Sequence, residues 1–82
     1  MELSIRVMRE GALMTREAAQ IAERMKLYSA SVLLQREDMT VNAKSLMGIV
    51  TLGVREGMML TIIAAGEDEA KAVCELAALL GA

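Results

Sequence analysis

Two hydrophobic periodicities alternate along this chain of 82 residues, and their order constrains the fold more than any other feature. Apolar side chains recur at every second position, as in half-buried strands, in segments 3–8, 31–35, 39–43 and 59–63. They recur three and four residues apart, as in amphipathic helices, in segments 15–25, 45–50 and 67–80. We therefore expect the order β-α-β-β-α-β-α in a single domain of residues 1–82.

This order favours an α+β domain in which a four-stranded antiparallel sheet is covered by helices on one face. The second and third strands form a hairpin around Glu37 and Asp38, although this turn lacks the glycine that two-residue loops favour. The other face of the sheet is then open, and the alternation places Leu33, Met59 and Ile63 on it. These three residues either form an oligomer interface or are isolated apolar surface residues, which are common.

Polar residues mark where the helices begin. Thr15 is the expected N-cap of the first helix, and Ser45 that of the second, because a hydroxyl there accepts a bond from an unpaired backbone N–H. Glu67, Asp68 and Glu69 precede the last helix, where negative charge complements the helix dipole. These three acids are adjacent and do not converge on one point, so no metal site is expected.

The amino-acid composition argues against several classes of function. A net charge of −2 and a single aromatic residue, Tyr28, give neither a basic field nor a stacking platform for nucleic acid. No apolar run reaches the length of a membrane span, and the lone Cys74 forms no internal disulfide. A cytoplasmic protein is expected. Without any histidine to generate a thiolate, Cys74 is interpreted as a structural thiol.

Two segments of the chain carry a resemblance to a known family. Residues 41–48 read Val-Asn-Ala-Lys-Ser-Leu-Met-Gly, and residues 51–54 read Thr-Leu-Gly-Val. They closely resemble the regulatory-serine region of HPr, the phosphocarrier of bacterial sugar phosphotransferase systems, and especially the catabolite-repression HPr-like proteins (Crh). Residues 66–73 also resemble the last helix of the family, so the resemblance covers essentially the whole chain. It implies the HPr-like open-faced sandwich that the element order predicts independently.

The family's phosphorylated histidine lies in a Gly-Ile-His-Ala-Arg-Pro-Ala segment, which aligns with residues 12–18 of this chain. Met14 takes the place of the histidine, and a thioether cannot form a phosphoramidate, so phosphoryl relay at this position is closed. Glu17 replaces the proline and sets a negative charge where the family's helix would receive phosphate. Whether Glu17 mimics a phosphate is left open. Arg16 alone retains the anion-binding chemistry.

With relay through a histidine closed, the resemblance implies regulation by phosphorylation of a serine. It implies that HPr kinase/phosphorylase modifies Ser45 and that the product binds a transcriptional regulator of carbon catabolite repression. By residue type alone, Ser45 would be an ordinary N-cap. The resemblance also implies a docking surface for partner proteins, formed by Met14, Arg16, Lys44, Leu46 and Met47.

Two other functions remain open. The first is an unphosphorylated scaffold or oligomeric interaction module that uses Leu33, Met59 and Ile63. The second is a ligand-binding domain of the ferredoxin-like type, which shares part of the element order but does not predict a helix start at Lys44 and Ser45. The favoured interpretation is a regulatory HPr paralogue that is not an enzyme and uses no cofactor.

Overall fold

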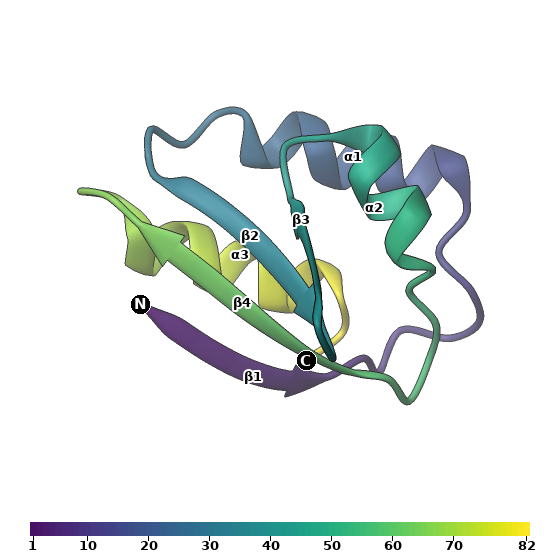
Figure 1. The fold of residues 1–82 in the computed structure, drawn as a ribbon. Helices are drawn as coiled ribbons and strands as arrows, with labels where there is room; N and C mark the ends of the chain where they lie inside the picture. Colours follow the sequence, from purple (N-terminus) through teal and green to yellow (C-terminus); the bar gives the residue numbers. More distant parts are fainter.

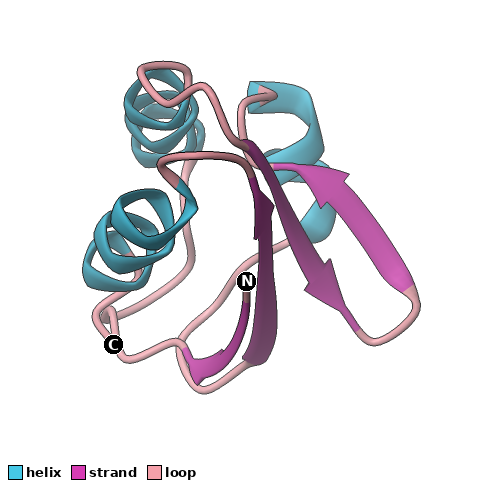
Figure 2. Ribbon diagram, turned by 90° about the vertical axis from the view of Figure 1, so that its left-hand side faces the viewer, coloured by secondary structure: helices cyan, strands magenta, loops and turns pink.

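The computed structural model describes residues 1–82 and contains the expected elements in the expected order. These are β1 (Glu2–Arg6), α1 (Thr15–Met25), β2 (Ser31–Arg36), β3 (Met39–Asn42), α2 (Leu46–Leu52), β4 (Met59–Ala65) and α3 (Glu69–Leu79). The strands form one antiparallel sheet in the order β1-β4-β2-β3. All three helices lie on one face of this sheet (Figures 1 and 2), so the predicted open-faced two-layer sandwich is confirmed.

The core lies between the sheet and the helices, and its register explains which side chains enter it. Leu34 of β2 lies opposite Ile62 of β4, and both are fully buried. The helices contribute the buried apolar residues Ile21, Met25, Ile49, Leu52, Val73 and Leu76. Burying each large side chain is worth about 1.5–3 kcal/mol, so this layer supplies most of the stability.

The alternate positions of the strands face away from the helices. Leu33 lies opposite Ile63 on this uncovered face, and both side chains are half-buried. Met59 is 55% exposed on the same face. The structure thus places these three residues where the period-2 alternation predicts.

Helix α1 begins one residue earlier than predicted, because Met14 and not Thr15 is its N-cap. A methionine has no side-chain oxygen to accept a backbone N–H. Instead, the carboxylate of Glu17 reaches back, and its Oε1 accepts a hydrogen bond of 3.0 Å from the Met14 N–H. This is the reciprocal half of a capping box, which works without a hydroxyl at the N-cap.

The acidic residues before α3 make specific bonds that the dipole interpretation does not include. The carboxylate of Asp68 accepts hydrogen bonds from the N–H groups of Ser29, at 2.9 Å, and Ala30, at 2.8 Å. It thereby ties the start of α3 to the loop before β2. These bonds lower the pKa of Asp68 below its ordinary value.

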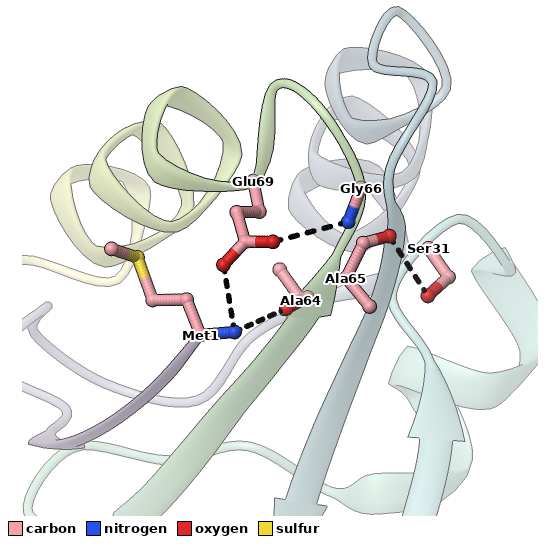
Figure 3. Close-up of polar contacts among 6 residues, drawn as sticks. All are labelled: Met1, Ser31, Ala64, Ala65, Gly66 and Glu69. Atoms are coloured by element: carbon pink, nitrogen blue, oxygen red, sulfur yellow. Dashed lines mark hydrogen bonds and ion pairs between the residues drawn. The ribbon is translucent and has the colours of Figure 1, made fainter.

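Glu69 forms a second link beside the end of β4 (Figure 3). One carboxylate oxygen accepts the Gly66 N–H at 3.2 Å, and the other pairs with the amino group of Met1 at 2.9 Å. That amino group also donates to the Ala64 carbonyl, while the Ser31 hydroxyl donates to the Ala65 carbonyl at 3.4 Å. The end of β4 and the start of α3 are therefore joined to β1.

A third polar link joins the helices α1 and α3. The guanidinium of Arg24 donates to both oxygens of Glu75, and the Tyr28 hydroxyl donates to one of them. These bonds lower the pKa of Glu75. Because the cluster lies near the surface, its main effect is to orient the two helices.

The hairpin turn stores local strain that a substitution should release. Glu37 has a φ of 55°, in the left-handed region, which costs an L-residue about 1–2 kcal/mol. We expect Glu37→Gly to raise the free energy of unfolding by about 0.5–1 kcal/mol, measured by urea denaturation. Asp38→Gly is the control. Asp38 has a negative φ, so a glycine there relieves no strain and should lower the free energy of unfolding. Equal effects of the two changes would contradict this explanation.

The Asp68 link should make stability depend on pH. Because the folded pKa lies below the ordinary value of 3.8, stability is present near neutral pH and is lost as the pH falls through the folded pKa. We expect Asp68→Asn to lower the urea midpoint at pH 7 and the difference from wild type to shrink at pH 3. Glu67→Gln, an exposed neighbour, should leave the pH 7 midpoint unchanged. A constant difference at all pH values would refute the linkage.

Candidate partner-binding site around Ser45

Ser45 lies where β3 ends and α2 begins, and the local sequence positions it. Its backbone is extended, with φ −108° and ψ 117°, and its Oγ accepts a hydrogen bond of 3.1 Å from the Gly48 N–H. Asn42 shapes the preceding turn, since its side-chain oxygen accepts the Lys44 N–H and its carbonyl accepts the Ser45 N–H. Ser45 is therefore the N-cap of α2, as predicted, and it is half-buried.

Close packing fixes helix α2 in place. A Cβ atom added at Gly48 would lie 3.2 Å from the Val41 Cβ and 3.3 Å from the Asn42 carbonyl, so the first turn of α2 lies tightly against the end of β3. At the other end of α2, Arg36 donates a hydrogen bond of 2.9 Å to the Leu52 carbonyl. A cation at a helix C-terminus also complements the dipole. The region around Ser45 is a firmly held platform.

The apolar residues predicted to dock differ in how far they are exposed. Met47 is 70% exposed, whereas Leu46 is half-buried and packs against the core. Val50, also on this helix, is 40% exposed. Val50 follows Met47 by three residues, the spacing that places two side chains on the same side of a helix. Met47 and Val50 are therefore the exposed apolar pair of α2.

Two further predicted residues lie at the beginning of α1, which packs beside α2 (Figure 1). Met14 is 64% exposed. Arg16 is also exposed and makes no hydrogen bond or ion pair within the chain. The structure thus leaves a thioether and a free guanidinium accessible on the helix next to α2.

Lys44 has an internal partner. Its Nζ donates a hydrogen bond of 2.8 Å to the carbonyl of Tyr28, in the loop that follows α1. The ammonium therefore helps to hold that loop against the start of α2, and it has less freedom to contact a partner than Arg16. Sequence reasoning missed this bond because it joins residues 16 positions apart.

The chemistry available at this site is limited. The chain has no histidine, and no group of three or more His, Cys, Asp or Glu side chains could hold a metal ion. Cys74 is a free, exposed thiol on α3. No helix has the length and apolarity to cross a membrane. At the start of α2 the chain presents the hydroxyl of Ser45, whose oxygen accepts the Gly48 N–H.

Comparison with known proteins identifies relatives along the whole chain. The family model described as "PTS HPr component phosphorylation site" matches residues 1–82. The HPr-like protein Crh of Bacillus subtilis is 41% identical over 66 residues, which are 80% of this chain and 78% of Crh. The phosphocarrier protein HPr of Haemophilus influenzae is 37% identical over 76 residues, 93% of this chain and 89% of that protein.

Solved structures agree with these relatives. HPr from Bacillus anthracis superposes with a TM-score of 0.91 at 33% identity, covering 96% of this chain and 94% of that one. Crh of Bacillus subtilis superposes with a TM-score of 0.80 at 36% identity, covering 94% and 88%, and is described as a swapped, intertwined dimer. With the family model spanning every residue and the fold matched throughout, the chain belongs to the HPr family of phosphotransferase-system phosphocarriers and is Crh-like.

Proposed function

We propose that this protein is a regulatory HPr paralogue, not an enzyme, that acts in the cytoplasm through reversible phosphorylation of Ser45. HPr kinase/phosphorylase adds the phosphate, and a transcriptional regulator of carbon catabolite repression binds the product. One observation carries the proposal: a Crh-like chain without any histidine keeps a serine hydroxyl at the N-cap of α2. This hydroxyl is the phosphoacceptor that the family resemblance leaves.

The backbone around Ser45 suits a phosphate. The N–H groups of Leu46 and Met47, in the first turn of α2, have no acceptor in the chain, and the Gly48 N–H is bonded only to the Ser45 Oγ. Phosphate oxygens on Ser45 can accept these bonds. Because α2 has seven residues, local hydrogen bonds contribute more than the helix dipole. Phosphorylation should therefore leave the fold unchanged.

A phosphate on Ser45 would change what a partner meets. The modification adds a charge of about −1.5 to −2 next to Met47 and Val50, the exposed apolar pair of α2. A partner with basic side chains beside an apolar pocket then gains contacts that the unmodified surface does not offer. Arg16 adds a free cation for an acidic group of the same partner.

The beginning of α1 supports the same function because it lacks a residue that could accept a phosphoryl group. Met14 replaces the phosphoaccepting histidine of the family. The Glu17 carboxylate accepts a hydrogen bond from the Met14 N–H, so that N–H is not free to bind a phosphate. An incoming phosphate there would meet a fixed negative charge and lack an imidazole to carry it. The serine is therefore the signalling position, and phosphoryl relay through α1 has no acceptor.

The first test is phosphorylation itself. After incubation with HPr kinase/phosphorylase and ATP, we expect intact-mass analysis to show one added phosphate on wild type and none on Ser45→Ala. Loss of the N-cap should lower the free energy of unfolding of Ser45→Ala by about 1 kcal/mol, so circular dichroism must show that this variant is folded. Ser45→Thr keeps a hydroxyl and serves as the second control. An unmodified wild type, or undiminished labelling of folded Ser45→Ala, would refute the proposal.

The second test concerns the docking surface. We expect Met47→Lys to weaken binding of the phosphorylated protein to a catabolite regulator by about tenfold or more, measured by calorimetry, because a charge enters the apolar contact. Since Met47 is 70% exposed, the free energy of unfolding should change by less than about 0.5 kcal/mol. Met59→Lys, which adds the same charge on the open sheet face, is the matched control and should bind normally. Equal weakening by both changes would place the docking surface elsewhere.

A further inference from the structure

The outer edge of β1 is a feature that the proposed function does not use. β1 is an edge strand that pairs with no strand but β4 and also packs against α3. Met1 and Ala64 exchange both of their backbone hydrogen bonds, and Val7 donates to Met58 at 2.8 Å and accepts from Gly57. In an antiparallel pair such bonds recur at every second residue. The odd-numbered residues of β1 therefore bond to β4.

The even-numbered residues of β1 point their backbone groups in the opposite direction. Glu2, Ser4 and Arg6 direct their N–H and C=O groups to the free edge, and none of these groups has a partner in the chain. An edge strand of this kind is a template for another strand. Nothing in the chain covers it, as the free side of β1 in Figure 1 also shows.

The side chains along this edge have a charge pattern that complements itself. Glu2 and Arg6 lie two residues on either side of Ser4, on the open face of the sheet, and both are exposed. Neither makes an ion pair or a side-chain hydrogen bond within the chain. Opposite charges directly across an antiparallel pair stabilise the pairing, and like charges there destabilise it.

We propose that β1 pairs edge to edge with β1 of a second copy, antiparallel and with the two-fold axis at Ser4. In this register Glu2 lies opposite Arg6 of the second copy, and Arg6 lies opposite its Glu2. Ser4 lies opposite Ser4, and all three pairs exchange backbone hydrogen bonds. A shift by one residue turns the bonding groups of one strand away, and a shift by two leaves a charge without its opposite. The result is a closed dimer with a continuous sheet.

The apolar face of the same strand supports this pairing. Leu3 faces the helix side of the sheet opposite the buried Ile62, yet it is 41% exposed, because nothing covers it from the free edge. It lines an apolar groove between β1 and α3, together with Val73, Cys74 and Ala77. The proposed register brings Ile5 of the second copy directly opposite Leu3 and so covers it. The small side chains on α3 leave room for this approach.

The interface is small, and the dimer differs from the swapped dimer described for Crh. A five-residue edge buries less than the ~1,200–2,000 Å² of stable interfaces, so we expect a weak dimer that forms with rising concentration. Each β1 also stays on its own β4, whereas a swapped dimer exchanges elements between copies. The surface around Ser45 takes no part in it.

Charge exchange tests the register. In sedimentation equilibrium over micromolar to millimolar concentrations, Glu2→Arg and Arg6→Glu should each raise the dimer dissociation constant about tenfold or more, because like charges then face each other twice. The two variants mixed should form a heterodimer, because each supplies the charges that the other lacks. The double variant Glu2→Arg/Arg6→Glu should dimerise like wild type. A monomeric wild type at millimolar concentration, or a mixture without heterodimer, would overturn the inference.

A backbone change separates edge pairing from strand exchange. Ser4→Pro removes an outward N–H while sparing the bonds of β1 to β4, so the dimer should be lost and the monomer retained. A dimer that survives Ser4→Pro would be of another kind and would contradict the proposal. Should this variant not fold, hydrogen exchange of wild type decides, since the Glu2, Ser4 and Arg6 amides must gain protection as concentration rises. Leu33→Lys, on the open sheet face but two strands away from β1, must leave the dimer intact, and loss of the dimer in this variant would assign the interface to that face.

Discussion

Burial of one face of the two central strands, β2 and β4, beneath three helices is the constraint on which the rest of this molecule depends. Leu34 and Ile62 face the helices, and the neighbouring positions, Leu33 and Ile63, face away from them. A shift of either strand by one residue would exchange these two sets. The register of the central pair therefore sets which side chains the helices cover, where α2 lies, and which edge of the sheet stays free.

Polar contacts then hold the parts that the core leaves loose. Asn42, Ser45 and Arg36 hold the two ends of α2, and Asp68 ties α3 to the loop before β2. Their effect is positional, since each joins a helix end to a strand or a loop. The proposed phosphate on Ser45 would therefore act by adding charge to a fixed surface, and no rearrangement of the chain would be needed.

Sequence patterns predict the strands and helices because each element buries one side, which produces the period of two or of three to four residues. The N-cap role of Ser45 is equally local, since it depends on a hydrogen bond to Gly48, three residues along the chain. Other features depend on contacts between distant residues. The bond that Lys44 donates to the Tyr28 carbonyl, and those that the Ser29 and Ala30 amides donate to the Asp68 carboxylate, have no local sequence pattern. The spacing of apolar residues in α2 does not show that Val50 is 40% exposed while Ile49 beside it is buried. Local chemistry is thus readable from the sequence, whereas exposure requires the assembled layers.

The two surfaces proposed for partners are compatible because the sheet order separates them. β1 lies at one edge of the sheet, while α2 packs against β3 at the other edge. Pairing through β1 would place the two Ser45 sites at the outer ends of a continuous sheet, with both hydroxyls still accessible. A symmetric regulator that reached both sites would bind the dimer more tightly than the monomer without any new contact, because the second binding event becomes intramolecular. Concentration and phosphorylation would then act together on the same complex.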